Sequence, residues 1–339
     1  MRFALIGLGF GATHLEWMSR CPSISVEAIG YHTRRDRAAA LADRFGIGRI
    51  TDDPLSLVAE AAIDAVAVVT PPDTHEEYAT AALERGLTVL CDKPLAHDVA
   101  AATRLAELAR RRGARTAVTF QWRTNPALRR LRELRRDGDL GPVFQTDLEF
   151  HHDFLAGPDT AWPWRHRRDR SGAGTLADQG VHLFDLLRWL AGGEWTVTGA
   201  RGAVQWPRRV AGETVLAAET EDVAEVWLDA TAARARILVS RVSGGHRTVR
   251  ASLVGTEATA TVVADPDDGS ATLTIHRPQG TEIQKLPPHP MNPYQLLVET
   301  GPDGEPPAGF DDGLAAQLML DETLSRMEST NHAIGPALW

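Results

Sequence analysis

Residues 3–14 read FALIGLGFGATH, a short apolar run that leads into a cluster of glycines. Gly7, Gly9 and Ala12 have the G-x-G-x-x-A spacing of a dinucleotide-binding turn between a strand and a helix. Gly7 allows a tight turn, Gly9 lets the backbone approach a pyrophosphate, and Ala12 lets the helix pack close to the strand. The N–H groups that begin the following helix favour phosphate. Short glycine motifs recur by chance. This one lies between an expected strand and an expected helix, which strengthens its assignment as a dinucleotide-binding turn.

The next hundred residues alternate apolar strands with helices. Strands are expected at 24–30, 63–70, 87–92 and 114–120, and helices at 37–46, 74–86 and 98–113. The run IDAVAVVT at 63–70 is almost unbroken, as is typical of a strand buried on both faces of a parallel sheet. Such alternation requires right-handed crossovers and places ligands at the carboxyl ends of the strands. The sequence therefore predicts an α/β fold that begins with a doubly wound, Rossmann-type domain over residues 1–122.

A lysine follows one of these strands. The chain's 36 Lys and Arg residues include only two lysines, Lys93 and Lys285, and Lys93 lies in VLCDKPLAHD (89–98). An amine is preferred to a guanidinium where the group must give up a proton or place a compact charge beside a reacting atom. The alternative is a coding bias towards arginine with a chance survivor. The carboxyl end of the strand favours a role for Lys93 beside a cofactor, whereas Lys285 is expected at an ordinary surface.

The turn after the second strand bears on the choice of nicotinamide cofactor. A carboxylate about 20 positions past the glycine motif would bind the adenosine ribose 2′-hydroxyl. The second strand ends AIGYHTRRD (28–36), with no carboxylate at its tip. Thr33, Arg34 and Arg35 could instead bind a 2′-phosphate through charge-assisted hydrogen bonds, or they could be solvated turn residues. We expect NADP to be preferred over NAD.

A second candidate site lies in SGAGTLADQGVHLFD (171–185). A glycine-rich entry precedes an expected helix on which Asp178, His182 and Asp185 stand at i, i+4 and i+7, on the side opposite its leucines. A carboxylate near the first turn stays ionised and could raise the proton affinity of an imidazole one turn along. This pair would serve acid–base chemistry. The alternative is that Asp178 is a helix cap and His182 a satisfied core histidine.

Composition excludes several other classes of function. The 339 residues exceed one ordinary core and fit two domains. The net charge of −9 argues against a nucleic-acid partner, and the arginines of 127–141 are expected on a solvated helix face. Two cysteines, Cys21 and Cys91, make no disulfide framework and suit a reducing compartment. No apolar run reaches the roughly 18–20 residues that cross a membrane, and no export signal is visible, so we expect a cytoplasmic protein.

The remainder of the chain predicts a second domain over 123–339. Alternating β-branched stretches between 142 and 276 predict a large, mostly antiparallel open sheet in an α+β domain, and 276–293 is expected to be a loop. One broad face of that sheet is a candidate subunit interface. His151 and His152 would point to opposite faces of a strand, so we expect no metal site.

These segments together resemble the oxidoreductase family named after glucose–fructose oxidoreductase, inositol 2-dehydrogenase and a rhizopine-catabolism protein (Gfo/Idh/MocA). The resemblance covers nearly the whole chain and is most specific in two long blocks, 68–96 and 171–192, with a similar terminal helix at 310–323. It departs from the family at Asp92, where EKP becomes DKP, and at 172–174, where Gly-Gly-Gly becomes Gly-Ala-Gly. It implies that the terminal helix packs on the first domain and that subunits pair through the flat sheet as a homodimer or homotetramer.

The resemblance also implies a catalytic triad of Lys93, Asp178 and His182. His182 would take the hydroxyl proton as hydride leaves, Lys93 would stabilise the developing alkoxide, and Asp178 would help to orient the group. The implied activity is an NAD(P)-dependent hydride transfer between nicotinamide and a secondary hydroxyl or carbonyl of a sugar, cyclitol or related polyol. Two alternatives stay open, namely a non-catalytic dinucleotide-sensing regulator and a redox-neutral NAD-dependent glycoside hydrolase or lyase.

The expected binding residues form two sets. The cofactor set is Gly7, Gly9, Phe10, Gly11, Ala12, Thr33, Arg34, Arg35, Thr70, Pro71, His75, Asp92 and Lys93. The substrate set is Arg123, Trp162, Trp164, Arg165, Asp178 and His182. By resemblance, the first of these arginines lies at the domain junction and faces substrate or nicotinamide, but as an exposed junction residue it could equally be structural. Trp162, Trp164 and Arg165 could stack on and hydrogen-bond to a sugar-like ring, or they could only stabilise the conformation of their own loop.

Overall fold

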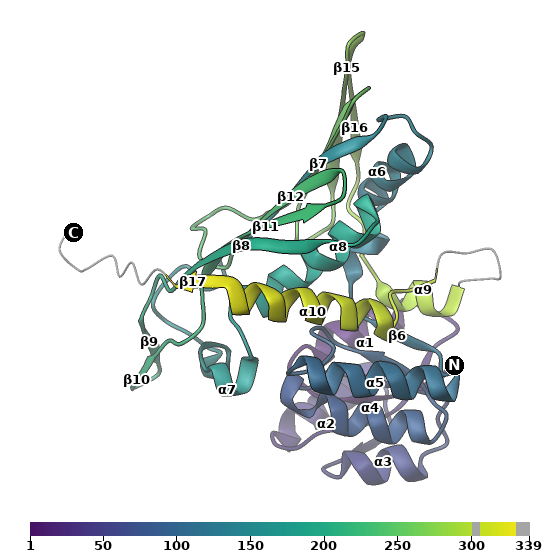
Figure 1. Ribbon diagram of the computed structural model, residues 1–339. Helices are drawn as coiled ribbons and strands as arrows, with labels where there is room; N and C mark the ends of the chain where they lie inside the picture. Colours follow the sequence, from purple (N-terminus) through teal and green to yellow (C-terminus); the bar gives the residue numbers. More distant parts are fainter. Residues whose placement is uncertain (300–305, 330–339) are drawn as a thin grey trace. The chain divides into compact units, whose positions relative to one another are not determined.

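A computed structural model describes residues 1–299 and 306–329 of the chain (Figure 1). The chain divides into two compact units. Unit 1 comprises Met1–Gln121 and Asn292–Gln317, and unit 2 comprises Trp122–Met291 and the described chain from Leu318 onward. Helix α10 (Phe310–Arg326) begins in unit 1 and ends in unit 2.

Unit 1 is built on a six-stranded sheet in which every strand pair is parallel. Its strands are β1 (Arg2–Ile6), β2 (Ser25–Gly30), β3 (Arg49–Thr51), β4 (Ala65–Val68), β5 (Thr88–Cys91) and β6 (Thr116–Val118). They lie in the order β3-β2-β1-β4-β5-β6, so the winding reverses between β1 and β4. Such a reversal opens a crevice for ligands at the carboxyl ends of the strands. The predicted Rossmann-type fold is confirmed.

Helices connect these strands and cover the sheet. They are α1 (Gly11–Ser19), α2 (Arg35–Phe45), α3 (Pro54–Glu60), α4 (His75–Glu84) and α5 (Val99–Arg112). Helices α3, α4 and α5 pack side by side (Figure 1). The short strand β3 and the helix α3 were absent from the sequence expectations. Helix α3 begins where the Asp53 side chain accepts a 3.0 Å hydrogen bond from the Ser56 amide and Pro54 takes the first helical position.

The core of unit 1 joins the two ends of its sequence. Strand β1 is buried from Phe3 to Ile6, and helix α9 (Pro293–Glu299) packs against it through Tyr294. The rings of Phe3 and Tyr294 meet edge to face at 5.6 Å, and the Tyr294 hydroxyl lies 2.8 Å from Nδ1 of His14 on α1. A segment nearly 300 residues away therefore completes the core beneath the glycine turn.

Unit 2 contains a nine-stranded sheet with the order β16-β15-β14-β13-β7-β12-β11-β8-β17. Its strands are β7 (Val143–His151), β8 (Thr196–Ala203), β11 (Val223–Ala230), β12 (Ala233–Ser240), β13 (Thr248–Gly255), β14 (Thr259–Ala264), β15 (Ala271–Arg277), β16 (Gly280–Leu286) and β17 (Met327–Ser329). All neighbours are antiparallel except β7 with β12 and β8 with β17. The predicted mostly antiparallel sheet is confirmed, but the expected loop at 276–293 is wrong because 280–286 pairs with β15 as a strand.

Two helices cover one face of this sheet, α6 (Pro126–Arg136) and α8 (Val181–Ala191). The leucines of α6 at 128, 131 and 134 are buried, as their helical spacing predicts. Along β7 the side chains of Thr146, Leu148 and Phe150 alternate inward towards these helices. A separate hairpin of β9 (Arg208–Ala211) and β10 (Thr214–Ala217) lies outside the large sheet. Among the helices within residues 1–299 and 306–329, none combines the length and the hydropathy that a membrane span requires.

The buried His14 imidazole makes the stability of unit 1 depend on pH. Burial lowers its pKa from the ordinary 6.5 to about 4, and Asp92 offsets only part of that shift. The unfolded chain therefore binds this proton near pH 6.5, whereas the folded chain does not until about pH 4. The free energy of unfolding consequently falls as the pH drops through this window, by about 3 kcal/mol in all.

We predict that His14→Gln flattens this dependence, because glutamine keeps a polar partner for Tyr294 but cannot take up the proton. Urea unfolding should show that the wild-type chain loses about 3 kcal/mol more than the variant between about pH 7 and about pH 4. His276→Gln, at an exposed position on β15, is the matched control and should keep the wild-type slope. Equal slopes for the wild type and His14→Gln would contradict the prediction.

Candidate active site

The turn between β1 and α1 requires glycine for reasons of backbone geometry. Gly7 has φ of +109°, and a Cβ there would lie 2.3 Å from the carbonyl oxygen of Val69. A Cβ on Gly11, the first residue of α1, would lie 3.2 Å from the Leu5 side chain, so the close packing of helix on strand falls at Gly11 as well as at Ala12. Beside Gly9 there is no atom of the described chain within 4 Å of an added Cβ. The side of Gly9 on which a side chain would project is therefore open.

The start of α1 suits an anion. Phe10 occupies the N-cap position without a side-chain hydrogen bond, and the first turn carries no acidic residue. The N–H groups of a first helical turn have no acceptor inside the helix, and the helix dipole favours negative charge there. The glycine turn and this helix start therefore fit the pyrophosphate of a dinucleotide.

The turn after β2 presents positive charge. Thr33, Arg34 and Arg35 are all exposed, and Arg34 has a left-handed φ of 67° at the start of α2. One helical turn later, Arg37 donates a 3.1 Å hydrogen bond from Nη2 to the carbonyl of Gly9. Arg37 was absent from the sequence expectations, although its position one turn beyond Arg34 was a signal that could have identified it. Arg37 therefore contacts the glycine turn directly, and Arg34 and Arg35 precede it at the start of α2.

Two buried contacts join the loops that follow β4 and β5. The ring nitrogens of His75 lie 2.8 Å from the carbonyl oxygen of Thr70 and 3.0 Å from that of Pro94. His75 is fully buried, so the structure places it as a brace between the two loops. Thr70 and Pro71 lie at the start of the first of these loops, and the Thr70 hydroxyl accepts a 2.8 Å hydrogen bond from Thr74.

The carboxylate of Asp92 holds the loop that carries Lys93. Its Oδ1 accepts a 2.9 Å hydrogen bond from the Lys93 backbone amide and a second from the hydroxyl of Thr119, beyond β6. Burial opposes ionisation of Asp92, but His14, the positive charge of Lys93 and the Thr119 hydroxyl together lower its pKa below the usual range. The shorter carboxylate of the DKP sequence therefore still anchors this loop, at the same sheet edge as Gly7.

In unit 2, the segment expected as one α-helix contains a π-helical turn. Leu176–Gly180 forms this turn, and α8 follows from Val181. The i→i+5 bonding of a π-turn changes the helix register by one residue, so the segment is not the single regular α-helix that was expected. Such turns are frequent at functional sites. His182 itself is buried at the start of α8, with its ring 6.3 Å from that of Phe150.

The Asp178 carboxylate forms an ion pair with Arg165. Arg165 Nη1 lies 2.7 Å from Asp178 Oδ2, and both side chains are nearly buried. The guanidinium of Arg165 also lies 4.8 Å from the ring centre of Trp164, 5.7 Å from that of Trp162 and 5.8 Å from that of Phe154. These cation–π contacts hold the arginine in place. Two tryptophans of the expected substrate loop therefore lie against Arg165, the residue that pairs with Asp178.

Arg123 has a different partner from the one expected. It is buried, not exposed, and its Nε and Nη2 donate to the two carboxylate oxygens of Asp185 at 2.8 and 2.5 Å. This bidentate pair joins the segment before α6 to α8. Asp185, the third member of the Asp178, His182 and Asp185 motif, therefore pairs with Arg123 within unit 2.

Within residues 1–299 and 306–329 there is no group of three or more His, Cys, Asp or Glu side chains that could hold a metal ion.

Comparison with known proteins agrees with this description. The model of the oxidoreductase family with an NAD-binding Rossmann fold, GFO_IDH_MocA, matches residues 1–120, and the GFO/IDH/MocA C-terminal domain matches residues 128–261. Levoglucosan dehydrogenase of Pseudarthrobacter phenanthrenivorans is 28% identical over 50% of this chain and 44% of its own length. Inositol 2-dehydrogenase 2 of Saccharopolyspora erythraea is 32% identical over 57% of this chain and 55% of its own. The chain thus matches about half the length of these relatives.

Solved structures extend the likeness over nearly the whole chain. An oxidoreductase domain protein from Kribbella flavida, 25% identical, superposes with a TM-score of 0.85 over 96% of this chain and 97% of its own. An NAD-binding oxidoreductase from Klebsiella pneumoniae, 23% identical, shares the fold with a TM-score of 0.86 over 96% of both chains. With both domain models matched in sequence order and this fold throughout, the chain belongs to the Gfo/Idh/MocA family of oxidoreductases.

Proposed function

We propose that the protein is an NAD(P)-dependent oxidoreductase that transfers a hydride between nicotinamide and a secondary hydroxyl or carbonyl of a sugar, cyclitol or related polyol. One observation carries the proposal. Lys93 leaves β5 at the sheet edge that also presents the Gly7 turn, and Asp92 and His75 hold its loop there. An amine held at a nucleotide-binding edge suits a reacting oxygen better than it suits a solvated surface.

The names of the relatives support the substrate class. They include inositol 2-dehydrogenases, a D-glucoside 3-dehydrogenase from Escherichia coli and a 1,5-anhydro-D-fructose reductase from Ensifer adhaerens. Each of these acts, by its name, on a ring that carries several hydroxyl groups. In this chain, Trp162 and Trp164 offer apolar ring faces beside Arg165, which suits such a substrate. We therefore place the substrate loop at 160–172.

The dinucleotide would be held by the residues of unit 1 described above. The glycine turn and the start of α1 would bind the pyrophosphate, and the segment around Thr70 and Pro71 would flank the nicotinamide half. When bound, the nicotinamide supplies the hydride chemistry. Exposed Arg34 and Arg35, with no carboxylate in the β2–α2 turn, support a preference for NADP. Both cofactors occur among structural neighbours, one solved with NADH and another with NADP.

Lys93, His182 and Asp178 would each have a different role in proton transfer and charge stabilisation. Lys93 would donate a hydrogen bond to the substrate oxygen and stabilise the alkoxide that develops there. His182 would accept the hydroxyl proton in the oxidative direction and return it in the other. Asp178 would orient this machinery, and its ion pair with Arg165 would keep the carboxylate in one position. The roles are those of general acid–base catalysis supported by a fixed positive charge.

The proposal also covers the pairing of subunits and the cellular compartment. The side chains of Val263 on β14 and Ile283 on β16 are exposed on the sheet face opposite the helices. These exposed apolar side chains support pairing of subunits through this face, as a homodimer or homotetramer. Cys21 and Cys91 form no disulfide with each other, in keeping with the reducing environment of the cytoplasm.

We predict that Lys93→Ala and His182→Ala each lower kcat by about 10²- to 10⁴-fold, because these groups act on the reacting oxygen. In His182→Ala, which lies outside the expected cofactor set, cofactor affinity should stay within about threefold of the wild type. The measurement is reduced-nicotinamide absorbance with a panel of sugars and cyclitols, paired with cofactor titration by fluorescence. The other lysine offers a matched control, since Lys285→Ala on β16 should leave both quantities unchanged.

Three outcomes would count against this assignment. Wild-type turnover in Lys93→Ala would show that the place of Lys93 at the sheet edge does not serve catalysis. Cofactor binding without turnover of any panel member would favour a sensing regulator. Conversion of a glycoside without net change in the cofactor would favour a redox-neutral hydrolase or lyase.

We predict that Arg34→Asn combined with Arg35→Ala lowers the ratio of kcat/KM for NADP over NAD by at least about tenfold, because charge-assisted hydrogen bonds to the 2′-phosphate are lost. Asparagine is chosen at position 34 because it tolerates the left-handed backbone there. Arg112→Ala, at the exposed end of α5, should keep the wild-type ratio. An unchanged ratio in the double variant would show that these arginines do not select the cofactor.

A further inference from the structure

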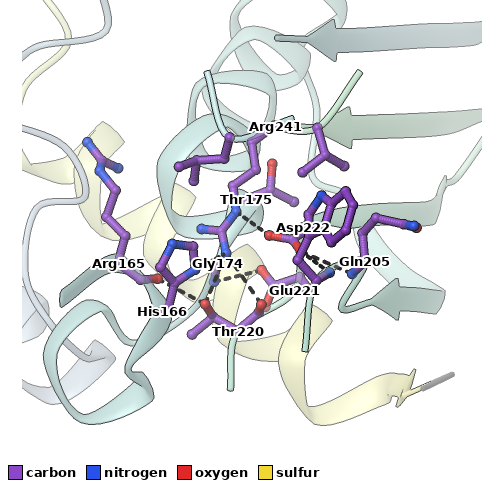
Figure 2. Close-up of polar contacts among 12 residues, drawn as sticks. Arg165, His166, Gly174, Thr175, Gln205, Thr220, Glu221, Asp222 and Arg241 are labelled. Atoms are coloured by element: carbon purple, nitrogen blue, oxygen red, sulfur yellow. Dashed lines mark hydrogen bonds and ion pairs between the residues drawn. The ribbon is translucent and has the colours of Figure 1, made fainter. Parts of the chain in front are cut away.

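Three consecutive buried residues, Thr220, Glu221 and Asp222, contact the segments of unit 2 that carry the candidate site (Figure 2). They lie between β10 and the start of β11, and each is at most 2% exposed. None was singled out from the sequence, where TEDVA resembles an ordinary polar turn before a strand. Each binds a different part of the chain, and we call them the 220–222 hub.

Glu221 accepts the hydrogen bonds of three successive backbone amides at the start of the Asp178 helix. Its Oε1 accepts from Gly174 at 2.9 Å and from Leu176 at 3.0 Å, and its backbone carbonyl accepts from Thr175 at 2.9 Å. The first amides of a helix have no partners within it. A residue 45 or more positions away therefore supplies the cap for the segment that carries Asp178.

The approach of Glu221 also explains the second glycine of the Gly-Ala-Gly sequence. A Cβ on Gly174 would lie 2.0 Å from the Glu221 carbonyl oxygen and 2.7 Å from its amide nitrogen. Only a residue without a side chain allows this backbone contact. The glycine at 174 is therefore a requirement of the hub and not of chain flexibility.

The neighbouring residue holds the other end of the Arg165–Asp178 ion pair. The Thr220 hydroxyl donates a 2.9 Å hydrogen bond to the Arg165 backbone carbonyl, and the Ser171 hydroxyl donates to the same oxygen at 3.3 Å. Thr220 thus positions the arginine, and Glu221 positions the helix start that carries its carboxylate partner. The 2.7 Å contact of Arg165 with Asp178 depends on both.

Asp222 anchors the hub in the interior. Its Oδ1 accepts from Arg209 at 2.8 Å and from Arg241 at 2.9 Å, and all three side chains are at most 1% exposed. Burial, acting against the attraction of Asp222, lowers the pKa of Arg209. Removal of one member of such a buried charged group is strongly destabilising, so Asp222 is a poor position for a functional test.

We propose that Glu221 is a positioning residue of the proposed reaction, which sets the place of Asp178 and His182 by capping the helix that carries them. This inference rests on the proposed oxidoreductase function. Without the Glu221 side chain, the buried amides of Gly174 and Leu176 lose their acceptor, whereas the Thr175 amide keeps the backbone carbonyl of residue 221. The adjacent π-turn can then relax to a different register. A displacement of about 1 Å at catalytic groups can cost about 10²-fold in rate.

A set of three substitutions tests the proposal. Glu221→Ala removes the Oε1 acceptor, and Glu221→Asp withdraws it by one methylene group. Glu221→Gln keeps it, and glutamine matches the neutral carboxyl that burial favours by raising the pKa of Glu221. We expect kcat to fall about 10- to 100-fold in Glu221→Ala and at least about fivefold in Glu221→Asp, with Glu221→Gln within about threefold of the wild type. Cofactor Kd should stay unchanged throughout, because the cofactor residues lie in unit 1.

The matched control is Glu225→Ala on β11, which removes an ion pair with Arg236 at the sheet surface and should leave kcat unchanged. Circular dichroism and thermal melting identify any variant that does not fold, and if Glu221→Ala fails, the aspartate and glutamine variants still decide the question. Wild-type kcat in Glu221→Asp, or an equal loss in Glu221→Asp and Glu221→Gln, would overturn the proposal. A wild-type chain that turns over no polyol would instead overturn the proposed function, which separates the two failures.

Discussion

The hydrogen bonds received by the Asp92 carboxylate are the constraint on which the candidate chemistry depends. They tie the backbone of Lys93 to Thr119, so the loops after β5 and β6 are held together at the carboxyl edge of the parallel sheet. The backbone amide of Thr119 donates in turn to the carbonyl of Cys91, at the end of β5. A lysine side chain is long and flexible, and only a fixed backbone gives its amine a defined region to sample. The family's longer glutamate is therefore replaced without loss of this anchor.

Much of the architecture follows from local patterns. Residues 3–6 of β1 and all of β4 are buried, unbroken apolar runs, and the glycine turn has its required backbone at Gly7, where φ is +109°. Two of the strands that were missed lack such patterns. Strand β3 has three residues at the sheet edge, and β16 is exposed on most of its positions and is followed by prolines, so neither shows an alternation of buried and exposed residues. Edge strands are specified by their neighbours more than by their own sequence.

The candidate site was predictable as residue types but not as contacts. Lys93 stood out as one of only two lysines, at the carboxyl end of a strand, and Asp178 and His182 stood out by their helical spacing. The resemblance to family motifs then joined them as one expected triad. The partners of these residues come from distant segments, as when Arg165 meets Asp178 and Arg123 meets Asp185. The π-turn at Leu176–Gly180 follows a helix start capped by Glu221, which lies far away in the chain. Long-range pairing of this kind leaves no local signal in the sequence. A turn that needs a positive φ, in contrast, is marked in the sequence by its glycine.

The central proposal is that the Lys93 amine and the His182 imidazole act on one substrate oxygen. The most direct measurement is a crystal structure of the protein with NADP and a bound polyol inhibitor. The account predicts that Nζ of Lys93 and a ring nitrogen of His182 both lie within about 2.6–3.2 Å of the same hydroxyl oxygen, next to the nicotinamide ring. A complex in which either side chain points away from that oxygen, with the cofactor fully bound, would contradict it.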